Sequence, residues 1–212
     1  MRFADRHSAG EALGERLAAI GPSNPLVLSL PRGGVPVGFE VASALACQLD
    51  ILVVRKVGVP FQPELAMGAV AEGGVIVRND DVIRLTGVDD ESFDSVVEAE
   101  VRELQRRIES YRAAAPAVDP AGTTAIIVDD GLATGSTAMA GVEALRARDA
   151  AAVWVAVPVA PRDTAHLLES RADRVVVVHL PMHFGAVGAW YRDFTQTGDD
   201  EVRELLAESR LR

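Results

Sequence analysis

The sequence predicts an α/β fold built on an open, mostly parallel, twisted sheet with helices on both of its faces. Short apolar runs rich in β-branched residues alternate with longer segments of helical periodicity, as in parallel strands that are joined by helices. One of these runs, Ile126 to Val128, is apolar at every position, which is typical of a strand buried on both faces. A chain of 212 residues can bury one large core, so we expect a single domain over residues 1–212.

The first part of the chain predicts two helices and two strands. Residues Ser8 to Glu11 match a capping box, which indicates the start of a helix. The expected elements are this helix to about residue 20, a strand over 26–30, an apolar helix ending near residue 49 and a strand over 51–57. Gly, Pro and Glu are frequent over residues 58–74, so we expect a loop or a short hairpin there rather than part of the core.

The second part continues the alternation. The charged segment from Asp90 to Arg112 has apolar residues at helical spacing and predicts one long helix. Further expected elements are strands over 123–128, 151–157 and 174–179, helices over 135–148 and 163–169, and a terminal helix over 199–211. Ligands of such sheets bind at the carboxyl ends of the strands, so we expect a site at that edge.

The composition argues against several classes of protein. Lys and Arg number 21 against 31 Asp and Glu, and this formal charge of −10 disfavours a nucleic-acid partner, because such binding depends on a basic surface. Cys47 is the only cysteine, which excludes an intramolecular disulfide, and its apolar setting suggests a buried helical thiol. There is no signal-like apolar region near Met1 and no apolar span of membrane length, so we expect a cytoplasmic location and no membrane partner.

The most informative motif follows the apolar run at 126–128. Two carboxylates, Asp129 and Asp130, lead into a small glycine-containing turn over 131–135, and a segment of helical composition begins at Ser136. The free N–H groups and the positive end of the helix dipole make such a turn an anion site. The carboxylates themselves need cationic or hydroxyl partners. A ribose 5-phosphate has both the phosphate and the hydroxyls that this arrangement requires.

Two other interpretations of the motif stay open. A nucleotide P-loop needs a lysine before the final Ser or Thr, whereas Gly135 is followed here by Ser136 and Thr137. Alternatively, the motif is an ordinary connection between a strand and a helix, in which the Asp pair only caps the helix.

The stretch from Ala125 to Thr137 resembles the loop of the type I phosphoribosyltransferases that binds 5-phosphoribosyl 1-pyrophosphate (PRPP). The resemblance implies that Asp129 and Asp130 bind the ribose 2- and 3-hydroxyls. It also implies that a set of loop residues wraps the 5-phosphate: Ala133, Thr134, Gly135, Ser136 and Thr137. It covers about residues 26–180, which would form the core. The terminal segments 1–25 and 181–212 are expected to form a small cap, the hood, over the site.

The resemblance also indicates where pyrophosphate binds. The turn from Pro31 through Arg32, Gly33 and Gly34 matches the family's pyrophosphate-binding loop in position and type. Arg55 and Lys56 follow at the expected end of the next strand, and Lys56 is the only lysine among the 21 basic residues. Arg32 and Lys56 are therefore predicted to act in catalysis with the acidic pair. The segment 58–70 resembles the loop that closes over PRPP, and its Glu64 is either a ligand contact or an ordinary surface carboxylate.

The implied reaction displaces pyrophosphate from C1 of PRPP through an oxocarbenium-like state. Mg²⁺ is the implied cofactor. It would arrive with the diphosphate and the ribose hydroxyls, with help from Asp129 and Asp130, so we expect no site made by the protein alone. His179 and His183 are expected to be rim or core residues rather than metal ligands.

The acceptor is the least explicit part of the sequence. Four of the ten aromatic residues lie between 184 and 194, and Phe184, Trp190 and Tyr191 are candidates for contact with a base. The same cluster is equally consistent with a small hydrophobic subcore that anchors the terminal helix. No signature identifies the base.

Two classes of function follow. The first is a phosphoribosyltransferase that moves the 5-phosphoribosyl group of PRPP to a nitrogenous base and releases pyrophosphate. The alternative is a PRPP-binding regulator or sensor without turnover. In both, the expected partners are small molecules, with a homodimer as a possible assembly.

Overall fold

Five parallel strands form the central sheet of the computed structural model, which describes residues 2–112 and 117–211. Their order across the sheet is β2 (Gln48–Ile51), β1 (Pro25–Ser29), β6 (Thr124–Val128), β7 (Ala152–Val159) and β8 (Arg174–His179). All four neighbouring pairs are parallel. The predicted α/β fold with a mostly parallel sheet is confirmed.

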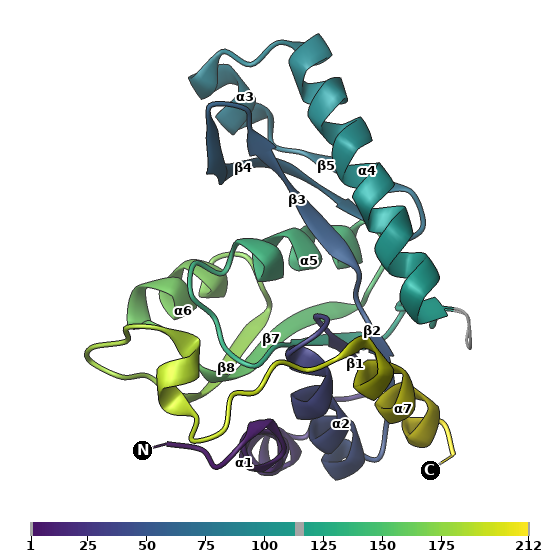
Figure 1. The fold of residues 1–212 in the computed structure, drawn as a ribbon, viewed down its shortest axis with the longest axis vertical. Helices are drawn as coiled ribbons and strands as arrows, with labels where there is room; N and C mark the ends of the chain where they lie inside the picture. Colours follow the sequence, from purple (N-terminus) through teal and green to yellow (C-terminus); the bar gives the residue numbers. More distant parts are fainter. Residues whose placement is uncertain (1, 113–116, 212) are drawn as a thin grey trace.

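Helices cover both faces of this sheet (Figure 1). The helices on one face are α1 (Arg6–Ile20), α2 (Gly34–Leu45) and α7 (Asp199–Ser209), and those on the other are α5 (Ser136–Arg146) and α6 (Arg162–Glu169). Alternate side chains of each strand therefore enter two separate cores. Val27 packs in the core of α1 and α2, whereas its neighbour Leu28 packs in the core of α5 and α6.

Helices α1 and α2 approach each other closely because α1 has glycines on the contact face. A Cβ on Gly10 would lie 2.7 Å from the carbonyl oxygen of Val37, and a Cβ on Gly14 would lie 2.7 Å from the Cβ of Ala44. The predicted capping box of α1 is displaced by three residues. Asp5 is the N-cap, and Ser8 takes the N3 position rather than the cap.

A second unit, the lobe over residues 54–112, projects above α5 (Figure 1). It consists of an antiparallel sheet, β3 (Val54–Val59), β4 (Gln62–Ala71) and β5 (Val75–Arg78), with helices α3 (Asp80–Thr86) and α4 (Asp90–Arg112). The expected hairpin is present, since β3 and β4 are antiparallel neighbours joined by a tight turn, but the expectation that it lies outside the core is wrong, because Met67, Ala69 and Val70 of β4 are buried. Helix α4 has the predicted bounds, whereas α3 was not predicted.

The predicted strand over 51–57 is two strands in two different sheets. Strand β2 ends at Ile51, the chain leaves the central sheet at Leu52 and Val53, and β3 begins at Val54 in the lobe. Residues 51–54 are apolar without a break because they are buried where the chain passes from one sheet to the other. The predicted helix end near residue 49 is also wrong. Helix α2 ends at Leu45, and residues 48–51 form the edge strand β2.

One buried arginine fastens the base of the lobe to the central sheet. Arg112, the last residue of α4, donates two hydrogen bonds to Glu72 at 2.7 Å each and one to Asp50 of β2 at 2.5 Å. It also donates to the carbonyl oxygen of Ile51 at 3.2 Å. Because Asp50 and Ile51 belong to β2 and Glu72 lies between β4 and β5 of the lobe, Arg112 fixes the lobe relative to the sheet.

The start of the chain lies beside the segment that follows the short helix η1 (Val187–Trp190). The N–H of Phe3 donates to the carbonyl oxygen of Trp190 at 2.8 Å, and the N–H of Arg192 donates to the carbonyl oxygen of Phe3 at 2.9 Å. Trp190 is the last residue of η1. Within residues 2–112 and 117–211, none of the helices combines the length and the apolar character that a membrane crossing needs.

Candidate functional site

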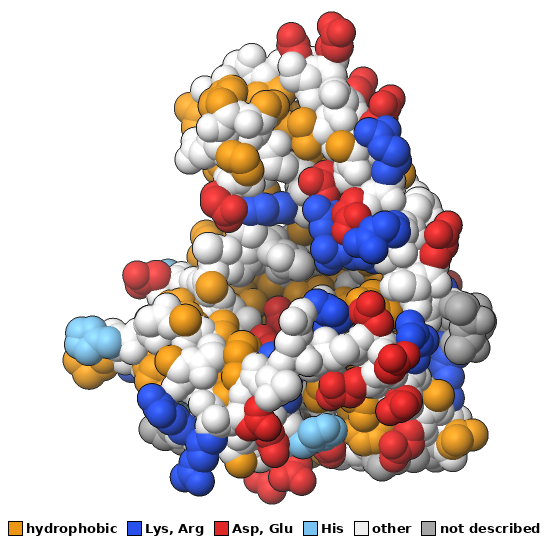
Figure 2. Space-filling model, viewed as in Figure 1, with side chains coloured by type: hydrophobic (Ala, Val, Ile, Leu, Met, Phe, Trp, Pro, Cys, Tyr) orange, Lys and Arg blue, Asp and Glu red, His pale blue; other side chains and the backbone are white. Residues whose placement is uncertain are grey.

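A cavity of about 530 Å³ opens between the carboxyl edge of the central sheet and the lobe. Figure 2 shows this face hollowed between the two units, with basic and acidic side chains on the lobe side of the hollow. The cavity is lined by Leu30, Pro31, residues 52–56 and 58–60, Pro63, Val96, Glu100, Arg107, Tyr111, Asp129 and Thr137. The cavity therefore lies at the edge where the sequence predicts a site.

The acidic pair lies where β6 ends. Asp129 lines the cavity, and its Oδ1 accepts the N–H of Asp130 at 2.9 Å. The Asp130 side chain points toward the start of α1, where its Oδ2 accepts a hydrogen bond from Arg6 Nε at 2.9 Å. Arg6 also donates to the carbonyl oxygen of Thr195 at 2.7 Å and covers the ring of Phe194. Arg6 was not predicted as a site residue, because nothing in the sequence of α1 marks it.

The predicted pyrophosphate turn packs directly against the acidic pair. A Cβ on Gly33 would lie 2.1 Å from Asp130 Oδ2, and a Cβ on Gly34 would lie 2.6 Å from the carbonyl oxygen of Val128. The contact at Gly34 is with backbone and leaves no room for a side chain, whereas a Cβ at Gly33 would displace the Asp130 carboxylate. The structure thus brings together two motifs that lie about a hundred residues apart in the sequence.

The acidic pair is electrostatically strained. Burial and the neighbouring charge of Asp130 raise the pKa of Asp129 well above its ordinary value. Burial also raises the pKa of Asp130, against the opposing effect of Arg6. A divalent cation or hydroxyl donors at this position would stabilise both carboxylates. Carboxylate oxygens are ligands that suit Mg²⁺, and Asp129 is the member of the pair that lines the cavity.

The predicted phosphate loop is held by α6. Gly135 has a positive φ of 73°, and a Cβ there would lie 2.8 Å from Thr164 Cγ2. The Thr164 hydroxyl donates to the carbonyl oxygen of Ala133 at 2.8 Å. Helix α5 begins at Ser136, so the N–H groups of its first turn have no partners within the helix. Thr137, in that turn, lines the cavity.

Two of the three basic residues predicted to bind pyrophosphate come from the lobe. Arg55 and Lys56 both line the cavity, but they lie inside β3 rather than at the end of a strand of the central sheet, which corrects the prediction. Lys56 Nζ donates to Glu64 Oε2 at 2.7 Å, and Arg55 pairs with Glu100 of α4. The Glu64 side chain is 79 % exposed, so it is a surface carboxylate whose partner is the cavity lysine.

Helix α4 contributes a wall that the sequence did not reveal. Val96, Glu100, Arg107 and Tyr111 all line the cavity. They are spaced along one side of a helix whose charged residues are typical of any amphipathic surface helix. These residues can be identified as part of the cavity wall only when it is known that the lobe folds back over the sheet.

The aromatic candidates for acceptor binding lie outside the cavity lining. Tyr191 is only 4 % exposed, lies 5.7 Å from the ring of Phe3, and donates its hydroxyl to the carbonyl oxygen of Asp130 at 2.5 Å. This favours the subcore interpretation for Tyr191. The Trp190 ring lies 5.0 Å from that of His179, and its Nε1 donates to the carbonyl oxygen of Phe184 at 2.9 Å. Both Trp190 and Phe184 are half-buried.

The model of the phosphoribosyl transferase domain family matches residues 6–189 of this chain. Two proteins of Mycobacterium tuberculosis, from strains H37Rv and CDC 1551, are 52 % identical over 204 residues and are each named "putative phosphoribosyl transferase". These matches cover 96 % of this chain but 46 % of each mycobacterial protein, so the chain spans about half the length of these relatives.

A solved structure shares the whole architecture. The crystal structure of the protein TT1426 from Thermus thermophilus is 41 % identical, with a TM-score of 0.93 over 98 % of this chain and 99 % of that one. The central sheet and the lobe therefore belong to a fold that has been observed experimentally.

Proposed function

Because this chain belongs to the phosphoribosyl transferase family, we propose that it moves the 5-phosphoribosyl group of PRPP to a nitrogenous base and releases pyrophosphate. The observation that most directly supports this reaction is the shared cavity of Asp129, Thr137 and Lys56, which come from the end of β6, α5 and the lobe. A carboxylate, a helix N-terminus and a cation at one cavity match the hydroxyls, the 5-phosphate and the diphosphate of PRPP.

In this proposal, the central sheet holds the ribose 5-phosphate half. Asp129 and Asp130 accept hydrogen bonds from the ribose 2- and 3-hydroxyls. The phosphate receives N–H groups from the loop over 133–137, with the hydroxyls of Thr134, Ser136 and Thr137 as further donors. Thr164 supports the loop through Ala133, so the donors are already arranged before the substrate binds.

The diphosphate half lies between the turn after β1 and the lobe. Gly33 and Gly34 let the backbone of this turn approach the acidic pair closely, and Arg32, Arg55 and Lys56 add positive charge. Negative charge grows on the diphosphate as its bond to C1 breaks, so these groups bind the transition state more strongly than the substrate. Mg²⁺, when bound to the diphosphate, neutralises part of the same charge.

The acceptor would approach from the side of the terminal segments. We propose that residues 1–25 and 181–212 form the hood, because Phe3, Arg6 and η1 meet beside Asp130. Among the residues proposed to contact the base, Trp190 and Phe184 are only half-buried and so are partly accessible.

If Trp190 stacks on the base, Trp190→Leu should weaken acceptor binding by about 1 to 3 kcal/mol while PRPP affinity stays unchanged. Equal losses for both ligands would assign Trp190 to packing.

A pyrophosphate-release assay tests the proposed reaction. The protein is incubated with PRPP, Mg²⁺ and a panel of purine, pyrimidine and other nitrogenous bases, and released pyrophosphate is measured. We expect release that depends on one class of base and is lost in Asp129→Asn. Tight binding of PRPP without release under any acceptor would instead identify a PRPP sensor. Absence of PRPP binding would contradict both functions.

A further inference from the structure

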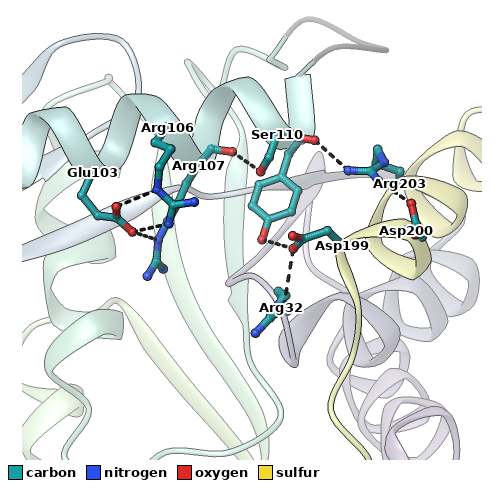
Figure 3. A network of polar contacts seen from close by, with 9 residues as sticks. Arg32, Glu103, Arg106, Arg107, Ser110, Asp199, Asp200 and Arg203 are labelled. Atoms are coloured by element: carbon teal, nitrogen blue, oxygen red, sulfur yellow. Dashed lines mark hydrogen bonds and ion pairs between the residues drawn. The ribbon is translucent and has the colours of Figure 1, made fainter.

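A charged network connects the C-terminal helix α7 with the lobe and with the turn after β1 (Figure 3). Tyr111 on α4 donates its hydroxyl to Asp199 Oδ1 at 2.9 Å, and Arg32 Nη1 lies 3.8 Å from the same oxygen. One turn further along α7, Arg203 donates to the carbonyl oxygen of Ser110 at 3.2 Å. Asp199 is therefore held between the lobe and one of the cations assigned to the diphosphate.

The contact between Arg32 and Asp199 is loose. The two groups are 3.8 Å apart, and 39 % of the Arg32 side chain and 46 % of the Asp199 side chain are exposed. Ion pairs with this exposure are screened by water and contribute little stability. A diphosphate has several negative charges and can meet a guanidinium with two oxygens at once. A bound diphosphate would therefore replace Asp199 as the partner of Arg32.

Asp199 keeps other partners when Arg32 leaves. Burial and the hydrogen bond to Asp199 raise the pKa of Tyr111, so its hydroxyl stays protonated and continues to donate. Asp199 is also the first residue of α7, where the positive end of the helix dipole stabilises a carboxylate. The Asp199 carboxylate therefore keeps its position beside the diphosphate subsite, whether or not Arg32 is in contact with it.

We propose that Asp199 is a positioning residue that holds Arg32 while the diphosphate subsite is empty and competes with pyrophosphate for Arg32 after transfer. The proposal rests on the phosphoribosyltransferase function above. Because the fixed carboxylate competes with the diphosphate for Arg32, it weakens the binding of pyrophosphate and promotes its release. It takes no part in bond breaking.

Titration calorimetry with inorganic pyrophosphate and Mg²⁺ tests this role without an acceptor. Asp199→Asn keeps the size of the side chain and an oxygen that can accept the Tyr111 hydrogen bond, but it removes the charge. We expect about three- to tenfold tighter pyrophosphate binding at low salt, and a smaller gain at high salt, where exposed charges are screened. In the Arg32→Ala background, Asp199→Asn should produce no gain.

Asp200→Asn is the matched control. It removes the same charge from the same helical turn, but the Asp200 carboxylate is 89 % exposed and pairs with Arg203 rather than Arg32. We expect its effect on pyrophosphate affinity to be much smaller. Asp199→Ser, which also suits the start of a helix, is the second variant if Asp199→Asn unfolds.

Several results would overturn the proposal. These are unchanged or weaker pyrophosphate binding in Asp199→Asn, an equal gain in Asp200→Asn, and a gain that survives Arg32→Ala. Failure of the wild-type protein to bind either pyrophosphate or PRPP would contradict the proposed function itself. The two failures are therefore distinguishable in the same set of titrations.

Discussion

At the scale of single residues, Asp129 is a position where the proposed function requires a side chain that lowers the stability of the fold. Its carboxylate is buried beside a second carboxylate, and both conditions disfavour ionisation. A protein without a ligand for this position would be more stable with a neutral side chain there. The strained pair is therefore explained by a hydroxyl- or cation-bearing ligand rather than by folding.

The raised pKa of Asp129 predicts a pH-dependent difference between wild type and Asp129→Asn. An unfolded aspartate loses its proton near pH 4, whereas the folded one keeps it to a higher pH. Between these values the native state binds more protons, so wild-type stability falls as pH rises. We expect Asp129→Asn to be more stable than wild type at pH 8 and similar at pH 4, while pyrophosphate release is lost. Urea unfolding at both pH values measures this, and a less stable variant at pH 8 would contradict it.

The site residues were predictable from the sequence to different degrees, for physical reasons. The motif at 129–137 is local: a buried strand, two acids and a turn follow one another, and the chain itself brings them together. Arg6 and Tyr111 reach the site only through tertiary packing of α1 and α4. Cys47 was predicted to be a buried helical thiol, but it is only partly buried and lies beyond the helix, which ends at Leu45. Burial nevertheless raises the pKa of this thiol to about 11, which makes it unreactive.

At the scale of elements, the connection between β6 and α5 depends on contact with α6. Gly135 has a left-handed conformation and lies against Thr164 and Leu168. A glycine is thus required there for two independent reasons, the backbone conformation and the lack of space. The loop over 133–137 is consequently shaped by α6 as well as by its own sequence.

Gly135→Ala should disturb this loop more than backbone strain alone can explain. The left-handed conformation costs alanine about 1 kcal/mol, and the clash with Thr164 Cγ2 at 2.8 Å would also displace the loop. We expect PRPP affinity to fall at least tenfold. Gly21→Ala is the matched control, because Gly21 has a similar φ of 71° with no atom within 4 Å of its Cβ position. Its PRPP affinity should equal that of wild type, and equal affinities in both variants would refute the role of the loop.

The element predictions failed where one apolar run serves two sheets. Residues 51–57 have no polar break at Leu52 and Val53, so periodicity alone cannot show that the chain changes sheets there. A hairpin was one expectation for residues 58–74, but the burial of β4 was missed because its Gly and Pro residues resemble those of a loop, although its second half is buried against α4 and α5. In contrast, α4 and β8 were predicted with correct bounds, because their patterns are long or uniform.

At the scale of the whole molecule, the cavity depends on how the lobe is fixed over the sheet. The Arg112 side chain is 11 % exposed, and its guanidinium joins Glu72 of the lobe to Asp50 of β2, whose side chain is 1 % exposed. Removing one partner of a buried charged cluster leaves the others uncompensated. The position of the lobe and the stability of the fold are therefore linked through this arginine.

Arg112→Met should lower the free energy of unfolding by about 3 to 5 kcal/mol, because Asp50 would keep a buried charge without its counter-ion. Urea unfolding gives the value. Arg106→Met, on the same helix, is the control: its side chain is 71 % exposed and pairs with Glu103, so it should change stability by less than about 1 kcal/mol. Similar losses in the two variants would show that Arg112 has no special role at the base of the lobe.

The most direct test of the central claim is a competition titration of PRPP binding in the presence of Mg²⁺. If the sheet edge holds the ribose 5-phosphate half and the lobe side holds the diphosphate half, PRPP binds once per chain. Ribose 5-phosphate and inorganic pyrophosphate, added separately, should each displace it, and the two halves should bind together without displacing one another. PRPP that fails to bind, or that is displaced by neither half, would contradict this account of the site.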